Sequence, residues 1–308
     1  MRKFLPFFLA LASWPVLANS GFNGRWDITP QNEPRRRAWW LEVEGAETRA
    51  PKGKFVSAYA GDLNIIDELK IEGDRITFGF RPKSGGHLVY RARLAGGKLV
   101  DGTVEDNGKV RSMTWVGVRA PEIKDKDDGS WKKGKPVSLF NGKDMTGWKA
   151  LIPDRDLGWT VKDGILTNAP KANNLISEQK FWNFELHAEF RVGEHSNSGI
   201  GLRGRYEIQI LEDYGEKQNS HNNGALYSRI APSENASKKA GEWQTFDIRL
   251  VGRHVKVVLN GKKIVEGEIE GLTAVAVDAN EGEPGPFILQ GDHGSVEFRK
   301  LVLTPLTR

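Results

Sequence analysis

The sequence predicts an almost entirely β protein made of two domains. Three observations support this: apolar residues with helical spacing are scarce, short alternating runs recur along the chain, and Gly, Asn, Asp and Pro separate these runs. The chain has 308 residues, which is long enough for two domains that each bury a core.

The N-terminus has the pattern of a secretory signal. Arg2 and Lys3 precede the apolar run 4–14, and Val16-Leu17-Ala18 resembles a cleavage site. The apolar run is shorter than the roughly 20 residues of a membrane-spanning helix, and no later segment reaches that length. We therefore expect residues 1–18 to be a signal peptide, the mature chain to begin near Asn19, and the protein to be periplasmic or secreted without membrane association.

The chain contains no cysteine, which excludes disulfides, thiolate metal sites and a lipid-modified N-terminal Cys. Its net charge of +5 is modest, and basic residues are interleaved with acidic ones. The two basic clusters, 35–37 and 132–135, are interpreted as solvated loops. No nucleic-acid partner is expected.

Residues 19–120 are predicted to form a small β-barrel. The alternating runs 75–80, 87–94 and 98–104 are strands, and Gly96-Gly97 is a tight turn. The segment 22–28 carries Gly-Arg-Trp and resembles the opening of lipocalin-like barrels. Trp26 and Trp115 are then expected in the barrel core. The stretch 121–136 is charged and poor in apolar residues, so it is predicted to be a linker.

Residues 137–308 are predicted to form a β-sandwich or jelly roll. Apolar and polar residues alternate in 184–191 and 246–250, as in half-buried strands. Asn260-Gly261 lies between two further apolar runs and is typical of a type I′ hairpin turn. Antiparallel strands joined by such turns build sandwiches and jelly rolls.

A series of motifs runs in order through residues 137–306. They are 139–148 (LFNGKDMTGW), 159–164 (WTVKDG), 197–200 (NSGI), 206–210 (YEIQI), 224–227 (GALY), 241–243 (GEW), 259–261 (LNG) and 285–294 (GPFILQGDHG). In these motifs the chain resembles the 3-keto-disaccharide hydrolase family. The resemblance implies a concanavalin-like jelly roll that acts on sugars already oxidised at C3. The barrel would then either bind nothing, or supply a wall of the sugar site or a dimer contact.

A ketone at C3 acidifies the proton on C2, so a base can remove it, the enolate can expel the aglycone from C1, and water can add afterwards. We predict Glu207 and His293 as the acid and base and Arg203 as the enolate stabiliser. Arg203, Arg205, Glu207 and Gln209 share one parity along a strand and could form a polar face. The predicted substrate-binding residues are Asn197, Gln209, Tyr227, Gln290, Asp292 and Asp213.

Each of these residues also has a structural interpretation. His293 could cap its turn, Glu207 could pair with Arg205, Arg203 could pair with Asp213, and Tyr227 could be a core residue. The whole domain could also be a non-catalytic carbohydrate-binding sandwich.

A third interpretation is a retaining laminarinase-like glycosidase, because 207–212 resembles a Glu-x-Asp-x-x-Glu strand. Gln209 replaces the central acid. Strict alternation would also place Glu207 and Glu212 on opposite faces, whereas a retaining pair lies roughly 5 Å apart on one side, so a bulge would be needed.

No cofactor is assigned. Gly199–Gly204 matches a dinucleotide-binding pattern only in its letters, since a strand follows instead of a helix. A divalent metal ion is left open, with Glu207, Asp213, Asp292 and His293 as the available donors. The expected partner is a small oligosaccharide or glycoside, and a homo-oligomer is left open.

Overall fold

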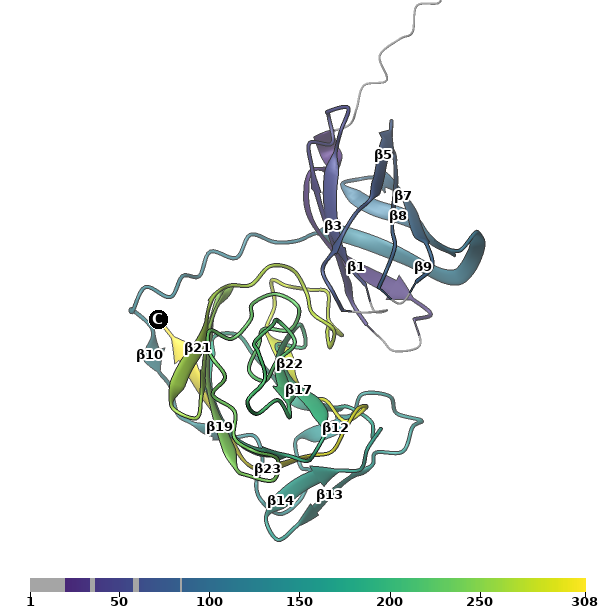
Figure 1. The fold of residues 1–308 in the computed structure, drawn as a ribbon. Helices are drawn as coiled ribbons and strands as arrows, with labels where there is room; N and C mark the ends of the chain where they lie inside the picture. Colours follow the sequence, from purple (N-terminus) through teal and green to yellow (C-terminus); the bar gives the residue numbers. More distant parts are fainter. Residues whose placement is uncertain (1–19, 34–36, 58–60, 84) are drawn as a thin grey trace, which may run out of the picture.

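The computed structural model describes residues 20–33, 37–57, 61–83 and 85–308 (Figure 1). The predicted signal peptide and its cleavage site lie outside these residues. The described part is built of strands, with one short 3-10 helix, η1 (Ser20–Phe22). None of its helices is long and apolar enough to cross a membrane.

The first domain is one antiparallel sheet of nine strands in the order β4-β3-β2-β1-β9-β8-β7-β6-β5. Its strands follow one another along the chain, and β1 pairs with β9. The sheet curls around its own core (Figure 1). The strands are β1 (Gly24–Gln31), β2 (Trp39–Glu44), β3 (Lys52–Val56), β4 (Asn64–Ile65), β5 (Glu68–Glu72), β6 (Arg75–Phe80), β7 (Leu88–Ala95), β8 (Lys98–Asp106) and β9 (Lys109–Arg119).

Aromatic residues fill the core of this sheet. Trp26 and Trp115 are both fully buried, as expected. Trp26 donates from Nε1 to the carbonyl of Phe22 at 2.9 Å, and the guanidinium of Arg119 lies over its ring at 3.8 Å. The indole therefore joins the first strand to the last one.

The segment after β9 is extended and lies against the second domain. Asp125 accepts hydrogen bonds from Trp182 at 2.7 Å and from Asn183 at 2.8 Å. Asp127 accepts two from Arg249 at 2.7 and 2.8 Å. Carboxylates of this charged segment thus form hydrogen bonds with the second domain.

The second domain is a jelly roll of two curled antiparallel sheets. One has the order β13-β14-β23-β16-β19-β20-β21, with β10 and β11 also paired to β23; the other has the order β12-β15-β22-β17-β18. The strands are β10 (Lys132–Lys133), β11 (Val137–Ser138), β12 (Trp148–Ala150), β13 (Trp159–Lys162), β14 (Ile165–Asn168), β15 (Leu175–Phe181), β16 (Phe184–Val192), β17 (Asn197–Leu202), β18 (Tyr206–Leu211), β19 (Gln244–Val251), β20 (His254–Leu259), β21 (Lys262–Glu268), β22 (Gly285–Leu289) and β23 (Val296–Thr307).

Local patterns in the sequence explain the larger sheet. Every second residue of β16 is buried, from Phe184 to Val192, and these side chains form part of the core between the sheets. Asn260 and Gly261 both have positive φ, 52° and 82°, and connect β20 to β21, as their type I′ turn preference predicts.

In the five-stranded sheet, β17, β18 and β22 are buried on both faces. One face, with Ile200, Ile208 and Leu289, belongs to the core of the jelly roll. The alternate positions of β17 and β18 are Gly199, Gly201, Glu207 and Gln209. This second face therefore combines small and polar residues, and it is covered by further parts of the chain.

Part of that cover comes from the first domain. The N–H of Ala38 donates to the carbonyl of Ala276 at 2.8 Å, and Trp40 is buried as a member of the jelly-roll core. Gly271 leaves room for this indole, since a Cβ there would lie 2.9 Å from the ring. The two domains thus share a packed interface.

The same interface buries a carboxyl group, Asp27 of β1. Its Oδ2 accepts the N–H of Glu281 at 3.2 Å, and Glu281 is itself paired with Arg253 at 3.0 Å. Burial, followed by the negative charge of Glu281, raises the pKa of Asp27 to about 8. Asp27 therefore holds a proton in the folded protein that the unfolded chain releases at much lower pH.

We expect Asp27→Asn to stabilise the protein most at alkaline pH. Because the pKa of Asp27 is higher in the folded protein than in the unfolded chain, its contribution to the free energy of unfolding falls as pH rises from the unfolded pKa to the folded pKa. Asn does not ionise, so the variant loses this pH dependence. The melting temperature of the variant should exceed that of the parent by about 3 °C or more near pH 8 and be similar near pH 4. The exposed Asp156→Asn is the control, and an unchanged pH dependence in Asp27→Asn would contradict the prediction.

Candidate functional site

Glu207 is the second residue of β18, opposite Gly201 of β17. Its N–H donates to Thr273 Oγ1 at 2.7 Å, and its carbonyl accepts the N–H of Tyr227 at 3.0 Å, so its backbone is fixed from two sides. A Cβ at Gly199 would lie 2.4 Å from Glu207 Oε1. Glycine at position 199 is therefore what allows the carboxyl group to occupy this space.

Glu207 is only 1% exposed, and its Oε2 is buried with no hydrogen-bond partner in the described part of the chain. Burial raises its pKa to about 7; the positive charges of Arg37 and His293 lower it, and Asp292 raises it. Glu207 is thus poised to gain or lose a proton near neutral pH.

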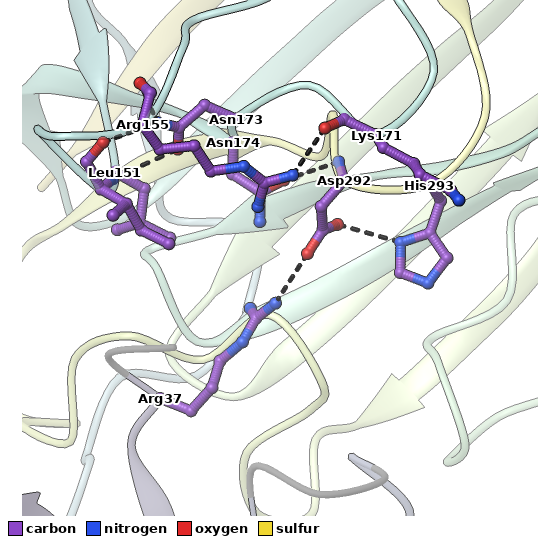
Figure 2. Close-up of a pocket in the computed structure, with 9 residues that line it drawn as sticks. Arg37, Leu151, Arg155, Lys171, Asn173, Asn174, Asp292 and His293 are labelled. Atoms are coloured by element: carbon purple, nitrogen blue, oxygen red, sulfur yellow. Dashed lines mark hydrogen bonds and ion pairs between the residues drawn. The ribbon is translucent and has the colours of Figure 1, made fainter. Parts of the chain in front are cut away.

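Arg37, Asp292 and His293 form a chain of charged groups beside Glu207. Figure 2 shows Asp292 between the other two: its Oδ2 lies 3.5 Å from Arg37 Nη2, and its Oδ1 lies 2.9 Å from His293 Nδ1. The hydrogen bond that His293 donates to the Asp292 carboxylate raises the pKa of His293. Burial alone would raise the pKa of Asp292, but the hydrogen bond with His293 and the charge of Arg37 outweigh it and lower that pKa.

A pocket of about 380 Å³ opens beside this chain. Its lining residues come from both domains: Arg37, Leu151, Ile152, Arg155, Lys171, Asn173, Asn174, Asp292 and His293 (Figure 2). Glu207 is not among them, but its pKa responds to three of them. The pocket volume lies in the range of small-molecule sites.

Two buried amides accompany Glu207. Gln209, two residues along β18, and Gln290, directly after β22, each have an Oε1 without a hydrogen-bond partner among the described residues. Gln290 is held through its backbone, because its N–H donates to Gly199 at 3.0 Å and its carbonyl accepts Ser198 Oγ at 2.8 Å. Buried polar atoms of this kind are costly unless something satisfies them.

Two further predicted residues border the same region. The ring of Tyr227 packs edge-on against His221 at 4.7 Å, and burial, then the charges of Glu207 and Asp62, raise its pKa to about 12. Asn197 begins β17, and its carbonyl accepts the N–H of Gly294 at 2.9 Å, next to His293. The structure therefore gathers Glu207, His293, Asp292, Gln209, Gln290, Tyr227 and Asn197.

Arg203 lies outside this group, contrary to its expected role. It stands in the turn between β17 and β18 with φ 53°, and its guanidinium is fully buried. It donates to the carbonyls of Trp182 at 2.6 Å and Gly252 at 2.7 Å and to Asn183 Oδ1 at 2.9 Å. The assumption of one polar strand face fails here because the strand begins only at Tyr206. Arg203 serves the interior of the fold.

Asp213 is also used internally. Its carboxylate accepts hydrogen bonds from Asn222 Nδ2 at 2.7 Å, the N–H of Asn223 at 3.0 Å and Ser237 Oγ at 2.6 Å, which fix the loop after β18. Glu207, Asp213, Asp292 and His293 therefore do not form one donor set. Within the described ranges, no three His, Asp or Glu residues gather as a metal site would require.

The alternative pairings of the polar residues do not form either. Arg205 pairs with Asp278 at 2.8 Å instead of Glu207. The pairing of β17 with β18 is regular, without the bulge that a retaining Glu207 and Glu212 pair needs. Glu212 instead accepts the N–H of His195 at 3.3 Å.

No pattern in the sequence indicates a role for Arg37 at this site. Arg37 belongs to the basic cluster 35–37, which is expected to be a solvated loop. The structure shows instead that Arg37 is only 8% exposed and lies against the jelly roll. Its partner Asp292 is in the other domain, so no local spacing could identify the contact. Lys171 and Asn174 lie in the same domain as Asp292 and His293 but contact residues 291–293 from far away in the chain, so local spacing does not indicate them either. Arg37 of the first domain thus belongs to the lining of this pocket.

A family model described as the 3-keto-alpha-glucoside-1,2-lyase-like domain matches residues 135–304. The chain belongs to this family. Glu207, Gln209, Gln290, Asp292 and His293 all fall within the matched lyase-like domain, whereas Arg37 falls outside it.

Known proteins similar to the chain include one curated relative and two solved structures. The 3-keto-disaccharide hydrolase of Bacteroides thetaiotaomicron is 25% identical over 166 residues, which cover 42% of this chain and 57% of that protein. The chain thus spans little more than half of that relative's length. Two solved structures of Parabacteroides distasonis proteins assigned as glycosyl hydrolases match with TM-scores of 0.49 and 0.48. The first is 21% identical and its match covers 56% of this chain and 94% of its own. The second is 26% identical and its match covers 59% of this chain and 93% of its own.

Proposed function

We propose that this protein is a carbohydrate-active enzyme that cleaves 3-keto-glycosides by elimination followed by hydration. The family and the 3-keto-disaccharide hydrolase relative support this substrate class. The observation that carries the proposal is Glu207: a buried carboxyl with an unpartnered oxygen and a pKa of about 7, beside a pocket lined by charged and amide groups.

In this reaction Glu207 removes the proton from C2 of the keto sugar. The C–H electron pair forms the C2–C3 double bond of an enolate, whose charge rests on the C3 oxygen. The enolate then re-forms the ketone, a C1–C2 double bond appears, and the aglycone leaves from C1 with the electrons of the C1–O bond. Water adds to C1 and C2 receives a proton, which completes the hydrolysis.

His293 is the proposed acid for the leaving group. Its raised pKa keeps it protonated to higher pH than a free imidazole, and Asp292 orients it through Nδ1. Protonating the aglycone oxygen as the C1–O bond breaks avoids release of an unstable alkoxide. Half of the His293 side chain is exposed, so a bound sugar can reach it.

Arg37, instead of Arg203, is the proposed enolate stabiliser. It is a permanent cation held in a largely buried place by Asp292, and its charge already acts on Glu207. A fixed positive charge near the C3 oxygen stabilises the enolate without reorganisation of solvent. Gln209, Gln290, Tyr227 and Asn197 are the proposed partners of the sugar hydroxyls.

The proposal is tested by incubating the purified protein with a 3-keto-glucoside and the unoxidised glucoside and following the aglycone by chromatography. We expect release from the keto substrate and none from the unoxidised one. Binding of intact glycans without any release would instead support the non-catalytic carbohydrate-binding sandwich. Export of the mature chain from residue 19 is part of the proposal.

A further inference from the structure

The pocket beside His293 has more positive than negative charge. Arg37, Arg155 and Lys171 are three cations in its lining, and Asp292 is its one carboxylate among the described residues. Asp292 is already engaged by Arg37 and by His293. Arg155 and Lys171 therefore leave the pocket with positive charge that the site chemistry proposed above does not use.

Lys171 is held at the pocket in an unusual backbone conformation. Its φ is 61°, a left-handed value that Gly or Asn adopts at lower cost. Its N–H donates to the carbonyl of His293 at 2.8 Å, so the two residues lie side by side (Figure 2). The backbone of Lys171 is therefore anchored at the pocket, next to His293.

Arg155 is fixed next to Lys171. Its Nη2 donates to the carbonyl of Lys171 at 2.5 Å. Asn173 anchors its loop by donating to the carbonyls of Ile152 at 2.7 Å and Arg155 at 3.2 Å. Within the described part of the chain, no carboxylate forms an ion pair with either cation.

We infer that this pocket binds an oxyanion group, a carboxylate or a sulfate ester, carried by the sugar substrate. The inference rests on the proposed function in that the substrate is a sugar bound at this site. The Arg155 guanidinium is held by the carbonyl of Lys171, and the Lys171 ammonium belongs to the same pocket lining. A guanidinium fork and an ammonium group suit the several oxygens of such a group. The anion would lie over Arg155 and Lys171, with the reacting sugar toward His293.

Calorimetric titration of the full chain with glucuronic acid, glucose 6-sulfate and glucose tests this. We expect at least one anionic sugar to bind about tenfold or more tightly than glucose, and high salt to reduce this preference. The double variant Lys171→Gln/Arg155→Gln should lose the preference and keep its glucose affinity. Lys162→Gln, an exposed lysine on β13 outside the pocket, is the matched control and should behave as the parent.

The two anionic sugars distinguish a carboxylate from a sulfate ester as the natural group. Equal affinity for all three sugars, or an unchanged preference in the double variant, would overturn the inference. So would binding of inorganic sulfate as tight as that of glucose 6-sulfate, because the anion would then be recognised without its sugar. These sugars carry no ketone, so a protein without keto-glycosidase activity could still show the preference, and the two proposals fail separately.

Discussion

Replacing Glu207 by Gln should abolish most of the aglycone release from a 3-keto-glucoside while leaving the fold intact. Gln has nearly the same shape but cannot accept the C2 proton, and loss of a general base costs about 10³-fold in rate. Because the carboxyl is buried and its Oε2 has no partner among the described residues, removing its charge should not lower the melting temperature. Single-turnover rates and a thermal melt measure the two effects.

The pH profile makes this test specific. The pKa of Glu207 is about 7, and a base acts only when ionised, so kcat/KM should rise with pH through that value. The rate should fall again at the raised pKa of His293, as the acid loses its proton. Glu207→Gln should remove the rising limb.

Glu212→Gln is the matched control, because Glu212 directly follows the same strand and would be the second acid of a retaining pair. It should keep full activity. A Glu207→Gln variant that retains parental rates, or a Glu212→Gln variant that loses them, would show that another group removes the proton.

Replacing Arg37 by Met should reduce kcat by about 10²-fold, the effect of losing one group that stabilises a developing oxyanion. Met keeps an apolar stem of similar length, so the packing against the jelly roll is largely preserved. The charge of Arg37 lowers the pKa of Glu207, and without it that pKa should rise. The rising limb of the pH profile should therefore move to higher pH.

Arg37→Lys tests whether charge or geometry matters. Lysine restores a positive charge without the planar fork, so it should return the pH profile toward that of the parent and recover only part of kcat. Arg49→Met, an exposed arginine of the same domain, is the control. Parental kcat and pH profile in Arg37→Met would mean that the first domain contributes packing alone.

Local sequence patterns determined much of this fold. The alternation in 184–191, the Asn260-Gly261 turn and the buried Trp26 and Trp115 follow from side-chain periodicity and backbone preference, which act over a few residues. The ordered motifs in 137–306 likewise carried the family resemblance. They also pointed to Glu207, Gln209, Gln290, Asp292 and His293, which come from separate strands and loops and do gather.

The prediction for Arg203 assumed that strand alternation continues beyond the end of the strand. Arg203 and Glu207 share a parity on paper, but Arg203 sits in a turn with positive φ, and its guanidinium is taken up by backbone carbonyls. Asp213 was misassigned for a related reason, since a sequence does not show that neighbouring amides and a hydroxyl already satisfy its carboxylate.

The sequence by itself thus determined the all-β class, the jelly roll and the chemical types at the site. Tertiary structure alone decided which charges meet. The ion pair of Arg37 with Asp292, the pKa of Glu207 and the positive pocket around Lys171 arise from groups far apart in the chain. Such effects depend on burial and on distances of a few ångströms, which only the docking of the barrel against the jelly roll sets.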